Sequence, residues 1–137
     1  MTQLTEEVIQ TLVYKSVEVR QNARVPFSGY KVGAALLAED GTIYTGCNME
    51  IANMMHTICA ERAALAKATS EGRHHFKAIA VVGDSPDPIS PCGICRQTLS
   101  DFGLDIQVIM VTTRSNERLI KTVGELLPHA FLGSGDR

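Results

Sequence analysis

Cys59-Ala60-Glu61-Arg62 and Pro91-Cys92-Gly93-Ile94-Cys95-Arg96 are the two stretches around which this chain must fold. Cys92 and Cys95 are three residues apart, so on a helix they lie on one face and can bind the same tetrahedral ion. Cys59 would be the third ligand. Three protein ligands leave the fourth position of a zinc ion open for water, which distinguishes a catalytic zinc site from a closed structural one.

Length, composition and charge limit the class of protein. The chain has 137 residues, of which 45% are hydrophobic and 20% are charged. This is the balance of an ordinary globular protein with a buried core, and we expect one domain over residues 1–137. The formal net charge of −2 and the pI near 6.1 provide no basic patch that would follow a phosphate backbone. A small-molecule partner is therefore favoured over a nucleic acid.

The sequence contains no membrane or secretion signal. No apolar run approaches the roughly 20 residues of a membrane helix, and residues 1–7 lack a basic segment followed by an apolar one. We therefore expect a cytoplasmic protein without membrane contact. The four cysteines could instead form two disulfides, but without a secretion signal their spacing favours metal ligation. Cys47 is interpreted as an ordinary buried small residue.

Hydrophobic periodicity predicts alternating helices and strands. An amphipathic helix begins at Thr5, and Asp40-Gly41 between two apolar runs predicts a hairpin. Ser90-Pro91 should supply the N-cap and first-turn proline of a helix that Gly103 ends. The expected strands are 32–37, 42–47, 77–83, 106–111 and 118–121, and the other expected helices are 59–71 and a short piece at 123–127.

This order of elements predicts an α/β fold, a three-layer α/β/α sandwich with a five-stranded mixed sheet. About six residues, 112–117, join the last two strands. A parallel crossover needs about a dozen residues, so this pair should be antiparallel. Each ligand segment begins a helix that follows a strand, and sites in such sheets form at the carboxyl ends of the strands.

The residues around the cysteines suit a catalytic zinc ion. Three thiolates on Zn²⁺ leave a net charge of −1, which weakens the metal as a Lewis acid unless the protein compensates. Helix N-termini stabilise thiolates through their free N–H groups and their dipole. Arg62 and Arg96 follow the ligands closely and are expected to donate hydrogen bonds to the sulfur atoms.

Glu61 is the candidate proton carrier. Residues two apart on a regular helix point to opposite sides, so Glu61 can reach a water beside Cys59 only if Cys59 begins the helix. Glu61 would then take a proton from zinc-bound water and return it to the ring and leaving group of the substrate. The alternative is an exposed first-turn glutamate, which the helix dipole also favours.

Cys-x-Glu followed by Pro-Cys-x-x-Cys is the three-cysteine form of the zinc deaminase pattern. With these residues the chain resembles the cytidine deaminase family, of the short homotetrameric type, over nearly its whole length. Further matches are Pro26-Phe27-Ser28, Val32-Gly33-Ala34-Ala35, Gly46-Cys47-Asn48-Met49-Glu50 and Ser90-Pro91-Cys92-Gly93-Ile94-Cys95-Arg96-Gln97. The resemblance implies hydrolysis of cytidine and deoxycytidine to uridine and deoxyuridine in pyrimidine salvage, with release of ammonia.

The resemblance also implies roles for individual residues. Cys59, Cys92 and Cys95 would bind one zinc ion per chain, and Glu61 would be catalytic. Asn48 and Glu50 would bind the ribose 3′-hydroxyl, Tyr30 would lie against the base, and Ala60 would contact the substrate. Phe131 would reach the site from a neighbouring subunit of a homotetramer with shared active sites. On residue type alone, Asn48 and Glu50 could be loop polar residues, and Tyr30 and Phe131 core aromatics.

One segment departs from the family pattern. After Glu50 the family usually continues with Asn, Ala, a variable residue and Tyr, whereas this chain has Ile51-Ala52-Asn53-Met54. In the family this segment borders the 5′ end of the sugar and the subunit interface. Another cytosine nucleoside, such as blasticidin S or a modified cytidine, is therefore the alternative substrate.

Three other functions explain the sequence less well. The acidic pI and the short turn between the last strands argue against a nucleic-acid deaminase. Glu61 argues against a non-catalytic zinc module. A redox dithiol at Cys92 and Cys95 would leave Cys59 and Glu61 without a role.

Overall fold

The computed structural model describes residues 4–133, and a five-stranded sheet forms its centre. The strands are β1 (Gly33–Ala38), β2 (Ile43–Cys47), β3 (Phe76–Gly83), β4 (Gln107–Thr112) and β5 (Arg118–Thr122), in the order β2-β1-β3-β4-β5. β1 is antiparallel to both β2 and β3, and β3 is parallel to β4. β4 and β5 are antiparallel, as the short connection between them predicts.

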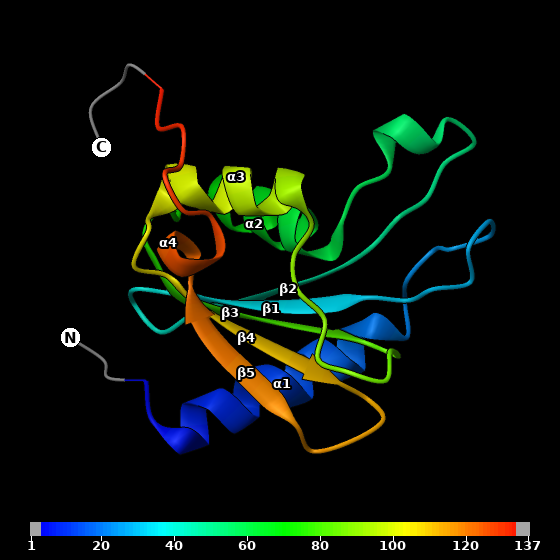
Figure 1. Ribbon diagram of the computed structural model, residues 1–137, viewed down its shortest axis with the longest axis horizontal. Coiled ribbons are helices and arrows are strands. Elements are labelled where there is room, and N and C mark those ends of the chain that lie inside the picture. Colours follow the sequence, from blue (N-terminus) through cyan, green and yellow to red (C-terminus); the bar gives the residue numbers. More distant parts are fainter. Residues whose placement is uncertain (1–3, 134–137) are drawn as a thin grey trace.

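Helices cover both faces of this sheet (Figure 1). α1 (Glu6–Arg20) lies on one face, and α2 (Ala60–Ser70), α3 (Gly93–Phe102) and α4 (Val123–Leu126) lie on the other. The predicted three-layer α/β/α sandwich is therefore confirmed. Within residues 4–133, no helix has the length and apolar character needed to cross a membrane.

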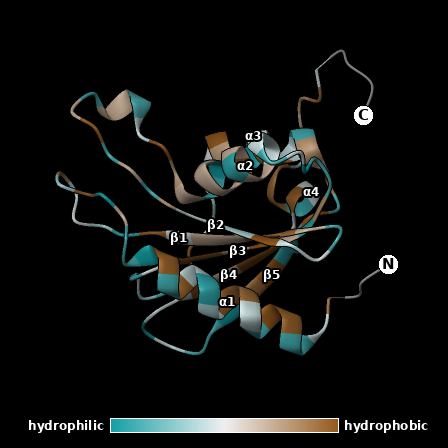
Figure 2. Ribbon diagram, turned by 180° about the vertical axis from the view of Figure 1, so that it is seen from behind, coloured by the Kyte–Doolittle hydropathy of each residue, from teal (hydrophilic) through white to brown (hydrophobic). Residues whose placement is uncertain are grey.

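The alternation of side chains along the strands builds two cores. Ala34, Leu36 and Ala38 of β1 point to the α2–α3 side, where they pack with Leu99 of α3. Ala35 and Leu37 point to the other side, where Leu12 of α1 covers them. Figure 2 shows the mostly hydrophobic strands between helices in which hydrophobic and hydrophilic residues alternate. The sheet is therefore buried on both faces, as a central sheet between two helical layers must be.

The helix starts decide where the ligand residues lie. Cys59 is the N-cap of α2, as the prediction for Glu61 requires. α3 starts later than predicted, because its N-cap is Cys92 and not Ser90. Ser90 and Pro91 remain outside the helix, where the Ser90 hydroxyl and the Pro91 carbonyl both accept hydrogen bonds from the Arg96 guanidinium. Both helices therefore begin at a cysteine.

The register of the strands brings distant loops to one edge of the sheet. Gly33 of β1 is paired with Cys47 of β2 on one side and with Val82 of β3 on the other. Gly83 is paired with Thr112 of β4. The start of β1 and the ends of β2, β3 and β4 therefore meet at this edge. A 3-10 helix, η1 (Met54–His56), lies in the loop that leads from the end of β2 to α2.

Gly46 allows the first turn of α2 to approach the sheet closely. A Cβ atom at this position would lie 2.5 Å from the Ala64 amide nitrogen and 2.6 Å from the Ala60 carbonyl oxygen. Neither contact can be relieved by moving a flexible side chain, because both involve main-chain atoms of the helix. A larger residue at position 46 must therefore push α2 and its N-terminus away from β2.

We predict that Gly46→Ala lowers the free energy of unfolding by about 3 kcal/mol, at the upper end of the usual cost of overpacking. Urea denaturation followed by circular dichroism measures this change. Gly93→Ala is the matched control, because no atom lies within 4 Å of a Cβ at that helical position. Equal stability of the two variants would contradict the close contact between α2 and β2.

Candidate active site

Three cysteine sulfurs meet where α2 and α3 begin. Cys59 and Cys92 are the N-caps of the two helices, and Cys95 lies in the first turn of α3. The three Sγ atoms lie within 4.8 Å of one another, and those of Cys59 and Cys92 are 3.8 Å apart. Neither N-cap thiol caps its own helix, so both remain available as ligands. Among residues 4–133 this is the one group of three potential metal ligands that lie this close together.

The surroundings of Cys59 favour a thiolate. Arg62 donates a hydrogen bond from Nη2 to the Cys59 sulfur at 3.4 Å and another to the Thr57 carbonyl at 3.0 Å. Hydrogen bonds from Cys95, then from Arg62 and Cys92, lower the pKa of Cys59 to about 5 against the opposing effect of burial. The same pairing with Cys59, together with burial, raises the pKa of Cys95.

The donor set suits a bound cation. The site stabilises one negative charge by itself, but three thiolates this close together repel one another unless a cation lies between them. Three cysteine sulfurs at helix N-termini match the soft, tetrahedral preference of zinc. The residues present therefore fit a zinc ion with three protein ligands, as the spacing of the cysteines predicts.

Arg96 has a different place from the predicted one. We expected its guanidinium at the sulfur atoms, beside that of Arg62. Instead, within the described part of the chain, Nε donates to the Pro91 carbonyl at 2.9 Å, Nη1 donates to the Leu126 carbonyl at 2.7 Å, and Nη2 donates to the Ser90 hydroxyl. Arg96 therefore joins the segment before α3 to the end of α4 and stabilises the position of α3, which carries Cys95.

Glu61 lies in the first turn of α2 and is buried, with 4% of its surface exposed. The alternative of an exposed first-turn glutamate is therefore wrong. Burial raises the pKa of Glu61 to about 7, and the negative charge at Cys59 acts in the same direction. A carboxyl group with a pKa near neutrality can both accept and return a proton at physiological pH.

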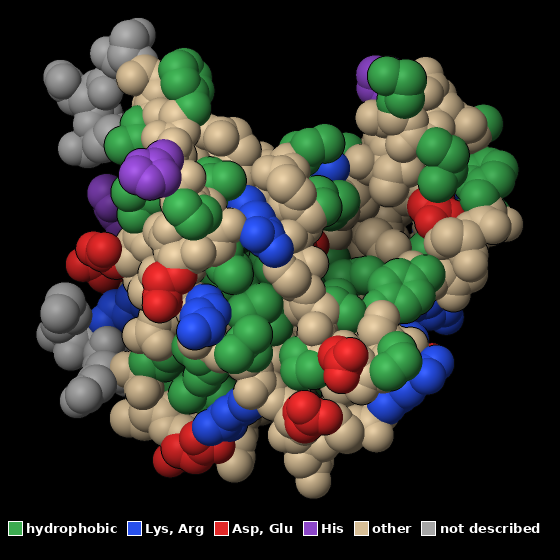
Figure 3. Space-filling view, in the orientation of Figure 1, with side chains coloured by type: hydrophobic (Ala, Val, Ile, Leu, Met, Phe, Trp, Pro, Cys, Tyr) green, Lys and Arg blue, Asp and Glu red, His purple; other side chains and the backbone are tan. Residues whose placement is uncertain are grey.

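A pocket of about 410 Å³ opens beside Cys59, Glu61 and Cys92, a size typical of small-molecule sites. Its walls come from the sheet edge, from the N-termini of α2 and α3, and from the loop after β3. The space-filling view shows a hollow between the loop that carries η1 and the rest of the helical layer (Figure 3). The other lining residues are Tyr30, Val32, Asn48, Thr57, Ala60, Ser85, Ile89 and Ser90.

Asn48 and Glu50 have separate places, although the sequence suggests a shared role. Asn48 lines the pocket, where its amide donates to the Tyr30 carbonyl and accepts from the Val32 N–H, both at 2.9 Å. Glu50 is buried and is not among the lining residues. Its carboxylate accepts hydrogen bonds from Ser28 and from the Phe27 N–H, which lower its pKa. Glu50 therefore stabilises the loop that leads to Tyr30.

Of the two aromatic residues predicted to contact the substrate, only Tyr30 lines the pocket. Tyr30 is 36% exposed. Phe131 is 77% exposed and lies outside the pocket lining, and its carbonyl accepts a hydrogen bond from Gln97 at 2.6 Å. Thr57 and Ser85 line the pocket although we did not predict a role for them. No sequence motif identifies these two, because they reach the pocket only through the folding of loops.

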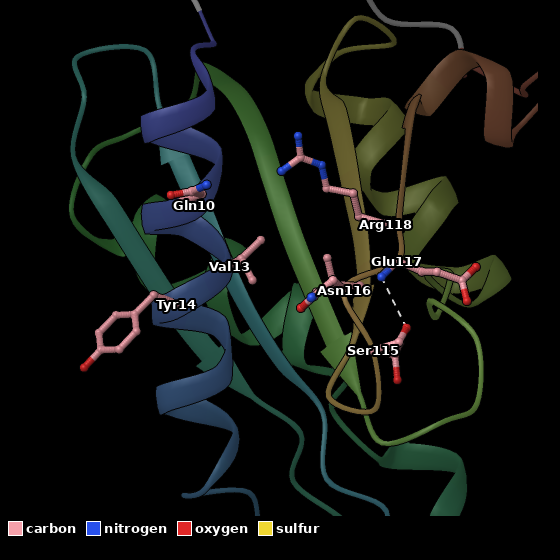
Figure 4. A pocket seen from close by; sticks show the side chains of 9 residues that line it. Gln10, Val13, Tyr14, Ser115, Asn116, Glu117 and Arg118 are labelled. Atoms are coloured by element: carbon pink, nitrogen blue, oxygen red, sulfur yellow. Dashed lines mark hydrogen bonds between the residues drawn. The ribbon is translucent and has the colours of Figure 1, made fainter.

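A second pocket, of about 280 Å³, lies between α1 and the turn that joins β4 to β5 (Figure 4). Two of its polar side chains form hydrogen bonds with neighbouring protein groups. The Arg118 guanidinium bonds to Glu6, and the Ser115 hydroxyl accepts from the Glu117 N–H at 3.2 Å. Tyr14 points away into solvent. This pocket lacks a reactive cluster among the described residues, so we place the chemistry in the pocket beside the cysteines.

Comparison with protein families supports this assignment. The cytidine and deoxycytidylate deaminase zinc-binding region matches residues 6–112, which is most of the chain and includes both ligand segments. This chain belongs to that deaminase family. The family match agrees with the cysteine cluster and with the α/β sandwich described above.

Individual members of the deaminase family show how far the similarity extends. The chain is 47% identical over 123 residues to a cytidine deaminase of Sporosarcina psychrophila, covering 90% of each chain. The crystal structure of cytidine deaminase from Burkholderia pseudomallei superposes with a TM-score of 0.87 at 38% identity, covering 93% of this chain and all of that one. A blasticidin-S deaminase of Bacillus cereus is 34% identical over 108 residues, covering 72% of this chain and 75% of that relative.

Proposed function

We propose that this protein is a zinc-dependent cytidine deaminase, which hydrolyses cytidine and deoxycytidine to uridine and deoxyuridine with release of ammonia. The observation that carries the proposal is the buried carboxyl group of Glu61 beside three converging cysteine sulfurs, in a pocket of nucleoside size. The identity to cytidine deaminases over most of the chain supports the same reaction.

Cys59, Cys92 and Cys95 would hold one zinc ion per chain. When bound, zinc would act as a Lewis acid that lowers the pKa of the attacking water. Glu61 takes a proton from the water that attacks C4 of the cytosine ring and then delivers protons to the ring nitrogen and the departing amino group. One C–O bond forms and one C–N bond breaks, so water is consumed and ammonia leaves. Arg62 holds Cys59 as a thiolate throughout.

Residues of the sheet edge and of α2 would bind the nucleoside. Ala60 lies at the α2 N-terminus next to Glu61, and Asn48 and Tyr30 line the same pocket. We propose that Asn48 binds the sugar hydroxyl and that the Tyr30 ring packs against the base. Glu50 would reach the sugar only by exchanging its bonds to Ser28, so its role in the bound state is the least direct of these.

Blasticidin S is the alternative substrate, because a blasticidin-S deaminase is also a relative of this chain. Residues 51–54, which differ from the family pattern, support keeping this alternative. Met54 and Met55 of η1 are exposed, the latter at 91%, and η1 is followed by Thr57 at the pocket wall. A different sugar-like group could be accommodated beside this loop.

We also propose a homotetramer with shared active sites, a cytoplasmic location, a role in pyrimidine salvage and one catalytic domain over residues 1–137. The proposed assembly would cover large apolar side chains that are exposed in the single chain. They include Phe27, Met55, Ile94 and Phe131. Four unpaired cysteines suit a reducing compartment.

The proposed function predicts loss of ultraviolet absorbance when the zinc-loaded protein is mixed with cytidine or deoxycytidine, because the amino group is replaced by a carbonyl. The same assay with blasticidin S measures the alternative. No change with any of the three substrates, at one zinc per chain, would contradict the proposal. Light scattering of the same preparation gives its mass, and a monomer would contradict the tetramer.

A further inference from the structure

Tyr30 is held at three points. Its N–H donates to the Ser28 hydroxyl at 3.0 Å, and its carbonyl accepts from the Asn48 amide at 2.9 Å. Its phenolic hydroxyl is hydrogen-bonded to the Ser85 hydroxyl. The first two bonds fix the main chain, but only the third acts on the far end of the ring. The bond to Ser85 therefore constrains the orientation of a ring that is 36% exposed.

Ser85 is itself fixed from outside the pocket. Its carbonyl accepts a hydrogen bond from the Thr112 hydroxyl at the end of β4. The neighbouring Asp84 carboxylate accepts from Thr113 at 2.8 Å and from Arg114 at 3.2 Å. The loop after β3 is thus tied to the turn after β4, and the Ser85 hydroxyl is held toward the pocket. Ser85 is half-buried, so it can be changed without opening the core.

Gly83 at the end of β3 also leaves room for the Tyr30 ring. A Cβ atom at Gly83 would lie 2.4 Å from the Tyr30 hydroxyl oxygen. The hydroxyl therefore lies over main chain that has no side chain, with Ser85 as its hydrogen-bond partner. Two segments far apart in the sequence, 28–32 and 83–85, are joined here by one side-chain bond between residues that both line the pocket.

We propose that Ser85 is a positioning residue, which holds the Tyr30 ring at the pocket wall through their hydroxyl–hydroxyl bond and thereby sets the affinity for the substrate. This inference rests on the proposed function, because it assumes that Tyr30 borders the nucleoside. Ser85 does not touch the reacting atoms in this account. Its loss should raise KM and leave kcat nearly unchanged, since Glu61 and the cysteines keep their places.

A double-mutant cycle tests this inference on the zinc-loaded protein with cytidine or with the best of the three substrates. We expect Ser85→Ala and Tyr30→Phe each to raise KM by about 3- to 10-fold, the effect of losing one neutral hydrogen bond. The double variant should match the single variants, because both remove the same bond. Ser85→Thr keeps a hydroxyl and should restore most of the affinity.

Thr11→Val is the matched control, because it removes an exposed threonine hydroxyl that donates to the Glu7 carbonyl within α1, on the face of the sheet opposite to α2 and α3. Its KM should equal that of the wild type. Additive effects in the double variant, or an unchanged KM in Ser85→Ala, would overturn the inference. A rise in KM in Tyr30→Phe alone would show that the phenol acts on the substrate directly. Wild-type protein that turns over none of the substrates would overturn the proposed function as well.

Discussion

Glu61→Gln is expected to lower kcat by about 10²- to 10⁴-fold while zinc remains bound at the wild-type level. Glutamine has the shape of glutamate but cannot accept and return a proton, and proton transfer by a positioned group contributes a factor of this size. The site should remain intact, because the three sulfurs and Arg62 do not depend on the Glu61 carboxylate for their positions. Substrate turnover by ultraviolet absorbance and zinc content by atomic absorption measure the two quantities separately.

The chain offers a matched control on the same helix. Glu71 is the exposed C-cap residue of α2, so Glu71→Gln makes the same chemical change far from the pocket. Its kcat should equal that of the wild type. The stability of Glu61→Gln should not fall, because the substitution removes a buried ionisable group whose charge is costly. Turnover by Glu61→Gln at more than about a tenth of the wild-type rate would contradict the role of Glu61 in proton transfer.

Cys92→Ala is expected to lose both zinc and stability. Cys92 is exposed, so truncation to alanine leaves no cavity and should by itself cost less than about 0.5 kcal/mol. A large effect must therefore come from the loss of a ligand that joins the starts of α2 and α3. Because metal bound only by the folded chain contributes directly to folding, we expect a loss of about 3 kcal/mol or more. Thermal denaturation and zinc analysis of the purified variant measure both effects.

Cys47→Ala provides the control for this change, because Cys47 is a half-buried cysteine of β2 outside the sulfur cluster. It should keep one zinc per chain. Chelation by EDTA should lower the melting temperature of the wild type and of Cys47→Ala, but should leave that of Cys92→Ala unchanged. Stoichiometric zinc in Cys92→Ala would contradict the assignment of this ligand.

Most of the scaffold could be predicted from local patterns. The hairpin at Asp40-Gly41, the helix that starts at Thr5 and the antiparallel last pair of strands are all confirmed. Each depends on residues that are close in sequence, such as a turn dipeptide, a capping side chain or the length of a connection. The predicted start of α3 was wrong by two residues, because the Arg96 side chain folds back to bond the Ser90 hydroxyl and the Pro91 carbonyl, which lie outside the helix.

In the candidate active site too, some features could be predicted from local sequence and others depend on contacts between distant segments. The spacing of Cys92 and Cys95 predicted that these two residues lie together, and the zinc deaminase pattern added Cys59. The access of Glu61 to the pocket depended on Cys59 beginning the helix, which it does as the N-cap of α2. The partners of Glu50 and Arg96 could not be predicted, because both side chains find acceptors and donors on segments more than a helical turn away. Ser85 belongs to no motif, and its contact with Tyr30 exists only in the folded chain.

The sequence by itself determined the chemistry of this protein, since the reactivity of a thiol or a carboxyl group is a property of residue type and the spacing of each pair is a property of the chain. Only the tertiary structure decided the environment of these groups. The burial that raises the pKa of Glu61, the bond from Arg62 to Cys59 and the bond from Ser85 to Tyr30 all depend on strand register and on loops that meet at one edge of the sheet. Those contacts are set by packing over the whole fold, which no short stretch of sequence contains.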